Sequence, residues 1–119
     1  MIKILEKYSK IIRKYQILKF EQFGENLRFR ARIEFINNTV LFVRETVING
    51  KQRKYAFHWQ DRERNLIIRW DNAPDWEVKT SPHHKHVKNK IEPSYERTLE
   101  KVLEFISSKM KDKNYEIGK

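Results

Sequence analysis

The sequence predicts an α+β fold, in which an antiparallel meander sheet of four to five strands carries an N-terminal and a C-terminal helix on one face. Three observations support this fold: helical spacing of apolar residues near both ends, a change to a spacing of two after Gly24, and Asn-containing turn signals between the alternating segments. The chain has no internal repeat and no Pro/Gly/Ser-rich linker, so we expect residues 1–119 to form a single domain.

The first predicted element is a helix over residues 2–18. Its apolar residues recur at the three- and four-residue spacing of one helix face: Ile4, Leu5, Tyr8, Ile11, Ile12 and Tyr15. A parallel row of lysines predicts a basic stripe beside the apolar one: Lys3, Lys7, Lys10 and Lys14. A solvated helix face is the more common explanation of such a stripe.

Four strands are expected next, over residues 27–36, 39–48, 51–60 and 66–71. Asn37-Asn38 and Asn49-Gly50 predict two-residue turns between the first three, because Asn and Gly tolerate a positive φ. Counting outward from the turns, and across a polar loop before the fourth strand, gives these cross-strand pairs: Phe35–Val40, Ile33–Phe42, Phe42–Phe57, Val40–Trp59, Trp59–Ile68 and Phe57–Trp70. They form one apolar face, on which Arg44 is the exception, and residues 76–80 supply a candidate fifth strand.

The chain ends in a predicted His-rich loop over residues 82–91 and a helix over residues 94–110. Ser94 is a favourable N-cap, and Glu96 follows it in the first turn. The apolar stripe of this helix consists of Leu99, Val102, Leu103, Ile106 and Met110.

The composition limits both chemistry and location. There is no Cys, which excludes a disulfide framework, a thiolate metal site and a Cys nucleophile. The first residues alternate Lys with apolar side chains and lack the continuous apolar core of a signal peptide, and no segment has the length of a membrane span. We therefore expect a cytoplasmic protein without a membrane partner.

The net charge predicts a polyanionic partner. The chain has 26 Lys and Arg residues against 16 Asp and Glu residues, a formal charge of +10. Such a charge attracts anions over long distances, and nucleic acid is the commonest polyanion in a cell. The alternative is that the charge serves only the solubility of a charge-rich protein.

The predicted register places many of these charges on the sheet face opposite the apolar one. Four cations there are candidates for binding RNA phosphates: Arg28, Arg30, Arg32 and Lys54. Arg rather than Lys in the first strand favours phosphate, because a guanidinium donates two parallel hydrogen bonds. An ordinary hydrated face of an antiparallel sheet is the competing interpretation.

Groups for acid–base chemistry are predicted on the same face. RNA cleavage without a metal needs a proton acceptor, a proton donor and fixed cations beside the phosphorane. His58, Glu45 and Asp71 can transfer protons there, and Arg69 can join the cations. A lone strand His is also common as a structural residue.

A second cluster is Pro82-His83-His84-Lys85-His86. In an extended segment His84 and His86 share one side, where imidazoles can act as acid–base groups or as zinc ligands. No Cys or acidic neighbour completes a metal site, and no Gly-rich phosphate loop is present, so we expect no metal and no cofactor. The cluster is then either the edge of an RNA site or an exposed polar loop.

Four motifs resemble a known family. They are YAFHWQD at residues 55–61, IRWDNAP at 68–74, PHHKHV at 82–87 and EPSYE at 92–96. Together they resemble the TumE family, the toxin half of toxin–antitoxin modules, over residues 27–106. The resemblance implies a toxin masked by a helix-turn-helix antitoxin, with a ribonuclease action, and it singles out as site positions His58, Arg69, Asp71, His83, His84 and His86.

Our leading hypothesis is a metal-independent endoribonuclease toxin acting on RNA, whose catalytic residues come from those six positions. Two alternatives explain the same basic surface. One is a non-catalytic nucleic-acid-binding module, and the other is a module that only docks an antitoxin. The sequence leaves open whether the chain forms a homodimer.

Overall fold

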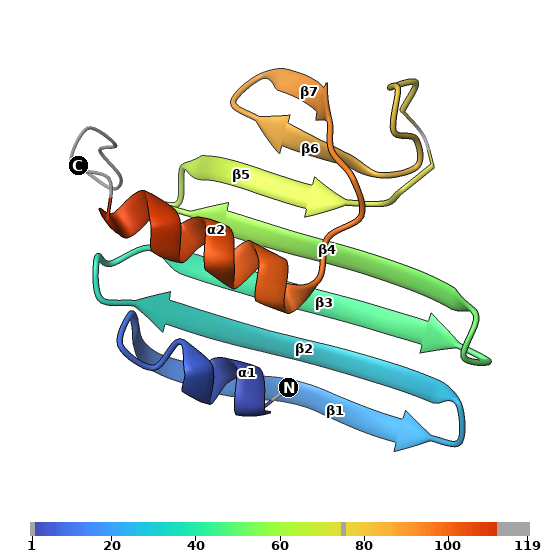
Figure 1. Cartoon of the computed structure of the whole chain (residues 1–119), viewed down its shortest axis with the longest axis horizontal. Coiled ribbons are helices and arrows are strands. Elements are labelled where there is room, and N and C mark those ends of the chain that lie inside the picture. The colour runs from blue at the N-terminus through green and yellow to red at the C-terminus, as the bar shows by residue number, and fades with distance from the viewer. Residues whose placement is uncertain (1, 75, 112–119) are drawn as a thin grey trace.

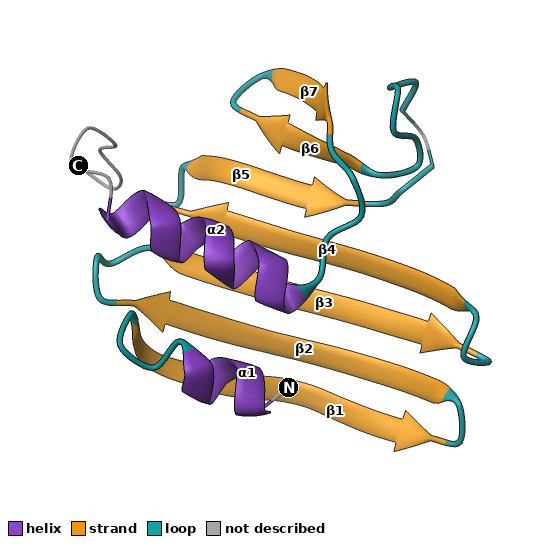
Figure 2. Ribbon diagram, in the orientation of Figure 1, coloured by secondary structure: helices purple, strands orange, loops and turns teal. Residues whose placement is uncertain are grey.

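The structure is a computed structural model that describes residues 2–74 and 76–111. A seven-stranded sheet, in which each strand pairs antiparallel with the next in the chain, carries two helices on one face (Figure 1, Figure 2). The elements are α1 (Ile2–Lys7), β1 (Ile12–Phe23), β2 (Asn26–Phe35), β3 (Val40–Ile48), β4 (Gln52–Gln60), β5 (Leu66–Asp71), β6 (His84–Val87), β7 (Lys90–Pro93) and α2 (Leu99–Lys111). The predicted α+β meander is confirmed, but the predicted count of four to five strands is wrong.

The predicted helix over residues 2–18 is wrong beyond Lys7, because β1 occupies most of that segment. Two register shifts, after Ile12 and after Ile17, interrupt the β1–β2 ladder. A bulge inserts one extra residue, so the side chains that share the helix-covered face with their β2 partners lie three, two and three residues apart: Ile12, Tyr15, Ile17 and Phe20. That spacing imitates a helix, whereas the backbone is extended.

The remaining two strands form a hairpin in the segment predicted as a His-rich loop. The strands β6 and β7 pair His84 with Pro93 and Val87 with Lys90. A two-residue turn joins them, and its first residue, Lys88, has a φ of 56°. The predicted strand over residues 76–80 is absent from the described part of that segment.

The two Asn-containing turns each hold one more residue than predicted. In the first turn Phe35 N–H donates to Thr39 O at 2.9 Å across residues 36–38, and Asn38 has a φ of 70°. Ile48 pairs with Gln52 across the second turn. A three-residue loop with a left-handed residue is the next most favourable hairpin connection after the two-residue loops.

As a result, β3 presents its two faces the opposite way from the prediction. Ile33 lies opposite Leu41, and Leu41 lies opposite Trp59, so Leu41 is buried in the core. Phe42 and Arg44 lie on the other face of the sheet. The predicted pairs that involve β3 are therefore wrong, whereas the β4–β5 pairs Trp59–Ile68 and Phe57–Trp70 are confirmed.

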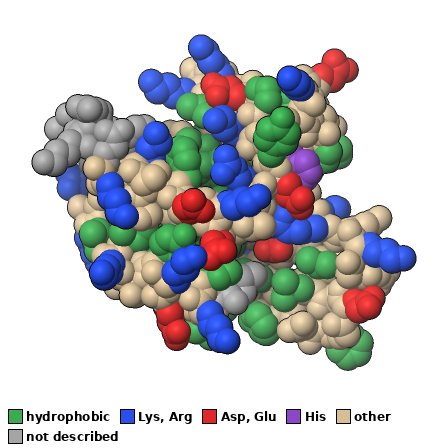
Figure 3. Space-filling view, viewed as in Figure 1, with side chains coloured by type: hydrophobic (Ala, Val, Ile, Leu, Met, Phe, Trp, Pro, Cys, Tyr) green, Lys and Arg blue, Asp and Glu red, His purple; other side chains and the backbone are tan. Residues whose placement is uncertain are grey.

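The core lies between the sheet and the helices. Its largest fully buried side chains are Trp59, Trp70, Phe29, Phe35 and Phe57, and α2 packs on them through Leu99, Val102, Leu103 and Ile106. On this side of the molecule basic and acidic side chains are interspersed over the surface (Figure 3).

The helix α2 begins at Leu99 rather than at the predicted residue 94. Thr98 caps it, because its Oγ1 accepts a hydrogen bond from Lys101 N–H at 3.2 Å. Ser94 instead donates its backbone N–H to Thr80 Oγ1 at 2.8 Å. Within the described residues, neither α1 nor α2 has the length and apolar composition that crossing a membrane requires.

Candidate functional site

The sheet face that the helices leave uncovered, here called the open face, carries a concentration of cations. Alternation along β1 to β5 brings to it Lys19, Arg28, Arg30, Arg32, Arg44, Lys54 and Arg69. The predicted positions of Arg28, Arg30, Arg32 and Lys54 on this face are confirmed, because the errors in register affect only β3. Arg44 is an addition, since the sequence-based register placed it among the core residues.

Two of these cations lie directly opposite each other. Arg30 on β2 pairs with Arg44 on β3, and Lys19 lies on the other side of Arg30. Neither Arg30 nor Arg44 forms an ion pair with any residue in the ranges 2–74 and 76–111. Like charges directly opposite on a ladder destabilise a sheet, so a bound anion would relieve the repulsion between Arg30 and Arg44.

Two hollows meet at these arginines. One, of about 420 Å³, includes Leu18, Phe42 and His58 in its lining. The other, of about 570 Å³, includes Lys54, Trp76 and His86. Four residues line both: Arg30, Arg44, Ala56 and Arg69. The small side chain of Ala56 on β4 leaves space between Arg44 and Asp71, its cross-strand neighbours.

A cross-strand row places two imidazoles on either side of an arginine. His58 on β4 lies opposite Arg69 on β5, as predicted, and Arg69 lies opposite His86 on β6. Arg69 Nη1 donates to His58 Nδ1 at 3.3 Å, and its Nε donates to Asp71 Oδ2 at 3.2 Å. Because a guanidinium only donates, Nδ1 of His58 is an acceptor and its neutral ring carries the proton on Nε2.

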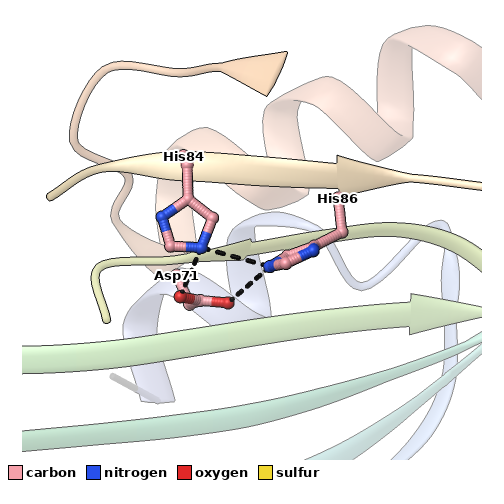
Figure 4. Close-up of side chains that lie close together, drawn as sticks. All are labelled: Asp71, His84 and His86. Atoms are coloured by element: carbon pink, nitrogen blue, oxygen red, sulfur yellow. Dashed lines mark hydrogen bonds and ion pairs between the residues drawn. The ribbon is translucent and has the colours of Figure 1, made fainter. Parts of the chain in front are cut away.

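Asp71, His84 and His86 form a compact cluster at one end of this row (Figure 4). His84 Nε2 lies 2.9 Å from Asp71 Oδ1, His86 Nε2 lies 3.4 Å from Asp71 Oδ2, and the two Nε2 atoms are 3.1 Å apart. Ala73 N–H also donates to Asp71 Oδ1 at 3.0 Å. The Trp76 ring lies beside both imidazoles, with its centroid 5.6 Å from that of His86.

The protonation of the cluster follows from its hydrogen bonds. His84 Nδ1 lies 2.8 Å from Pro82 O, a carbonyl that only accepts, so Nδ1 carries a proton. A neutral His84 would then direct a bare Nε2 lone pair at a carboxylate oxygen. Since both groups are buried, a proton or another cation must lie between them.

Burial shifts two histidines toward the neutral form. Desolvation, followed by the positive charge of Arg69, lowers the pKa of His58 below its ordinary value. Desolvation also lowers the pKa of His86, and the negative charge of Asp71 opposes that change. Neutral imidazole is the form that accepts a proton.

The structure brings together five of the six predicted catalytic positions: His58, Arg69, Asp71, His84 and His86. His83 is separate, because its Nδ1 lies 2.9 Å from Tyr55 Oη and its ring stacks on Tyr55, on the helix-covered side. Glu45, predicted to face the cations, also lies on that side, where it accepts from Arg53 Nε at 2.7 Å. The reversed faces of β3 account for its misplacement.

The predicted phosphate ligands differ in how far their charge is already engaged. Arg32 forms an ion pair with Glu34 and lies over the Phe42 ring, 5.9 Å from its centroid. Arg28 and Lys54 form no ion pair within the described residues. They flank a third hollow, of about 250 Å³, beside Arg30 and Arg44.

Sequence reasoning missed three residues of the site: Phe42, Arg44 and Trp76. Arg44 did give a signal, since a charged side chain on a predicted apolar face is anomalous. The sequence also gave no indication that Asp71 completes a potential metal-binding set with His84 and His86. The ligand atoms of these three residues lie within 4.8 Å of one another.

The comparison with protein families identifies the chain. Neither a curated protein nor a solved structure gives a significant match. The family model described as Toxin TumE matches residues 1–110, which is nearly the whole chain and extends the predicted resemblance to the N-terminus. The chain therefore belongs to the TumE family of toxins.

Proposed function

We propose that this toxin is a cytoplasmic endoribonuclease that cleaves RNA on its open face without a metal ion. The observation that carries the proposal is the row His58–Arg69–His86 beside Arg30 and Arg44, which have no ion-pair partner within residues 2–74 and 76–111. It supplies two imidazoles, of which a neutral ring can act as the base and a protonated ring as the acid, and a group of cations within one shallow surface.

The chemistry requires two proton transfers around one phosphate. A base takes the proton of the ribose 2′-OH, O2′ attacks phosphorus, and the 5′ oxygen leaves with a proton from an acid, giving a 2′,3′-cyclic phosphate. Neighbouring strands are about 4.8 Å apart, so the backbones of His58 and His86 are separated by roughly 10 Å. That separation accommodates a phosphodiester over Arg69, with one imidazole on the side of each reacting oxygen.

Three arginines are suited to the negative charge of the phosphorane. Arg69 lies between the two imidazoles, and Arg30 and Arg44 line the same two hollows. Fixed cations aimed at the position where charge develops stabilise a transition state without reorganisation. Asp71 holds the imidazole of His86 in position and balances the charge of Arg69.

Single-stranded RNA is the form of substrate that fits two adjoining hollows. Phe42 and Leu18 in one hollow, and Trp76 in the other, offer apolar contacts to the bases on either side of the phosphate. Splayed bases that contact aromatic side chains are the usual mode of single-strand RNA recognition.

A toxin of this family implies an antitoxin partner. We propose that the antitoxin is a helix-turn-helix protein with an acidic segment that covers the open face, because cations are concentrated on that face. Covering it would exclude RNA and protect the cell.

The test is RNA cleavage by the purified protein in the presence of EDTA. We expect cleavage of a single-stranded oligonucleotide to a 2′,3′-cyclic phosphate, no cleavage of the 2′-deoxy analogue, and slower cleavage by the double variant Arg30→Ala/Arg44→Ala. Salt-sensitive binding of RNA without any product would instead favour the non-catalytic binding module. Binding of the antitoxin with no measurable affinity for RNA would favour the docking module.

A further inference from the structure

We infer that Asp71, His84 and His86 form a binding site for a zinc ion, whose occupancy stops proton transfer by His86. The site goes beyond the proposed ribonuclease activity and does not depend on it. Only the effect of zinc on cleavage rests on that activity.

The distances among the ligand atoms fit a tetrahedral ion. Zinc lies about 2.0–2.1 Å from imidazole nitrogen and carboxylate oxygen, so two ligand atoms of a tetrahedral site are about 3.3 Å apart. The Nε2 atoms of His84 and His86 are 3.1 Å apart, and they lie 2.9 Å from Asp71 Oδ1 and 3.4 Å from Asp71 Oδ2, so both oxygens of the carboxylate face the imidazoles. One ligand atom from each of the three residues lies within 4.8 Å of the other two. Three protein ligands leave a fourth position for water, and two of the ligands, Asp71 and His86, line the second hollow.

The surroundings of the ligands favour a metal as well. His84 Nδ1–H donates to Pro82 O at 2.8 Å, which directs the lone pair of Nε2 toward Asp71. A histidine that binds a metal through one nitrogen typically donates its other N–H to a carbonyl or a carboxylate in this way. Asp71 is held by Ala73 N–H and by Arg69, so both ligands are fixed before an ion enters.

Borderline-soft zinc suits this set better than magnesium or calcium, because imidazole prefers such ions and the hard cations prefer oxygen. The positive charge of Arg69, 3.2 Å from Asp71, opposes any cation and limits the affinity. An ion there displaces the proton that otherwise separates His84 from the carboxylate. It also engages His86 Nε2, so that the neutral ring keeps its proton on Nδ1 and presents no lone pair to the hollow.

The binding experiment needs no RNA. The full chain is treated with EDTA, desalted and titrated with zinc chloride by calorimetry, with one zinc bound per chain as the expected result. His86→Ala and Asp71→Asn should weaken binding by at least about tenfold. His83→Ala, which changes the adjacent imidazole on the other face, should bind as the wild type does. Absence of zinc binding by the folded wild type, or equal binding by His86→Ala, overturns the site.

A second measurement uses the wild type alone, since Asp71 is buried and its replacement can impair folding. Cobalt(II) should give the visible absorption of a tetrahedral ion, and zinc should abolish that absorption by displacement. An octahedral spectrum would contradict the assignment.

The effect on activity is measured separately. Zinc at its binding concentration should stop RNA cleavage, and EDTA should restore it. Cleavage that zinc stimulates, or leaves unchanged while the site is occupied, contradicts the inhibition. If the protein cleaves no RNA at all, the ribonuclease proposal fails while the binding result stands.

Discussion

The two faces of the sheet are built from alternate residues of the same strands, yet they differ in how their charges are satisfied. On the helix-covered side, Arg53 contacts both Glu45 and Glu96, and Lys7 contacts Glu100. On the open face, Arg30 and Arg44 oppose each other without an ion-pair partner among the described residues.

This difference separates the residues that maintain the fold from those available for function. The apolar side chains of β4 that face the helices are buried, whereas His58 on the same strand lines a hollow. Burial and ion pairing stabilise the helix-covered face. The open face also has the ion pairs Arg32–Glu34 and Arg69–Asp71, but it keeps Arg30 and Arg44 opposite each other, and a bound anion would offset the cost of that like-charge pair.

The largest expected difference in cleavage rate is between variants of His86 and His83, which lie on opposite sides of the sheet. We expect His86→Ala to reduce the rate of RNA cleavage by roughly 10²–10⁴-fold, the usual contribution of a general acid or base. His83→Ala should cleave at the wild-type rate, because His83 contacts Tyr55 rather than the site. Single-turnover kinetics on the two variants measure this difference. An equal loss of cleavage rate in both variants would contradict a specific role for His86.

Two phenylalanines test whether the fold depends on one face more than on the other. Phe57 is fully buried under α2, whereas Phe42 is 36% exposed on the open face. Phe57→Ala should lower the free energy of unfolding by about 3–5 kcal/mol, and Phe42→Ala by much less. Urea denaturation gives both values. A larger loss at Phe42 would mean that the open face is covered in solution.

Replacing one of the two opposed arginines should weaken RNA binding and stabilise the fold. Arg44→Ala should reduce the slope of log K against log salt for RNA binding by about 1. It should also raise the free energy of unfolding by about 0.2–1 kcal/mol, because a like-charge pair is removed. The control is Lys101→Ala, an exposed lysine on α2. An unchanged salt slope for Arg44→Ala would remove Arg44 from the RNA surface.

The smallest expected effect is a dependence of stability on pH. The pKa of His58 in the folded chain lies below its ordinary value of 6.5, so the unfolded chain binds the proton more readily. Stability should therefore fall as the pH drops through 6.5, and it should be insensitive to this group at higher pH. Unfolding of wild type and His58→Gln between pH 5 and 8 isolates the contribution. A wild type that gains stability relative to the variant on acidification would contradict the neutral state of His58.

The fold class and the strands β2 to β5 could be predicted because their hydrophobic alternation is regular. The β4–β5 register followed from loop length and brought His58 opposite Arg69. The segment β1 could not be predicted, because two bulges replace its spacing of two with the spacing of a helix. The single extra residue in each Asn-containing turn reversed β3, and no local signal distinguishes such turns from two-residue ones.

The sequence predicted which residues belong to the site better than it predicted the contacts between them. Alternation suggested that His84 and His86 share a side, and the β6 strand confirms this. Their contact with Asp71 depends on long-range pairing of β5 with β6, which no spacing in the sequence reveals. The position of Trp76 beside them depends on the connection between these two strands.

A map of RNA contacts on the folded protein would show whether the open face is the surface that binds RNA. A non-cleavable 2′-deoxy oligonucleotide is titrated into ¹⁵N-labelled protein and followed by NMR. We expect the largest shifts at the Arg30, Arg44 and Arg69 side chains and at His58 and His86, with little change along α2. Shifts confined to α2 and the helix-covered side would contradict the account.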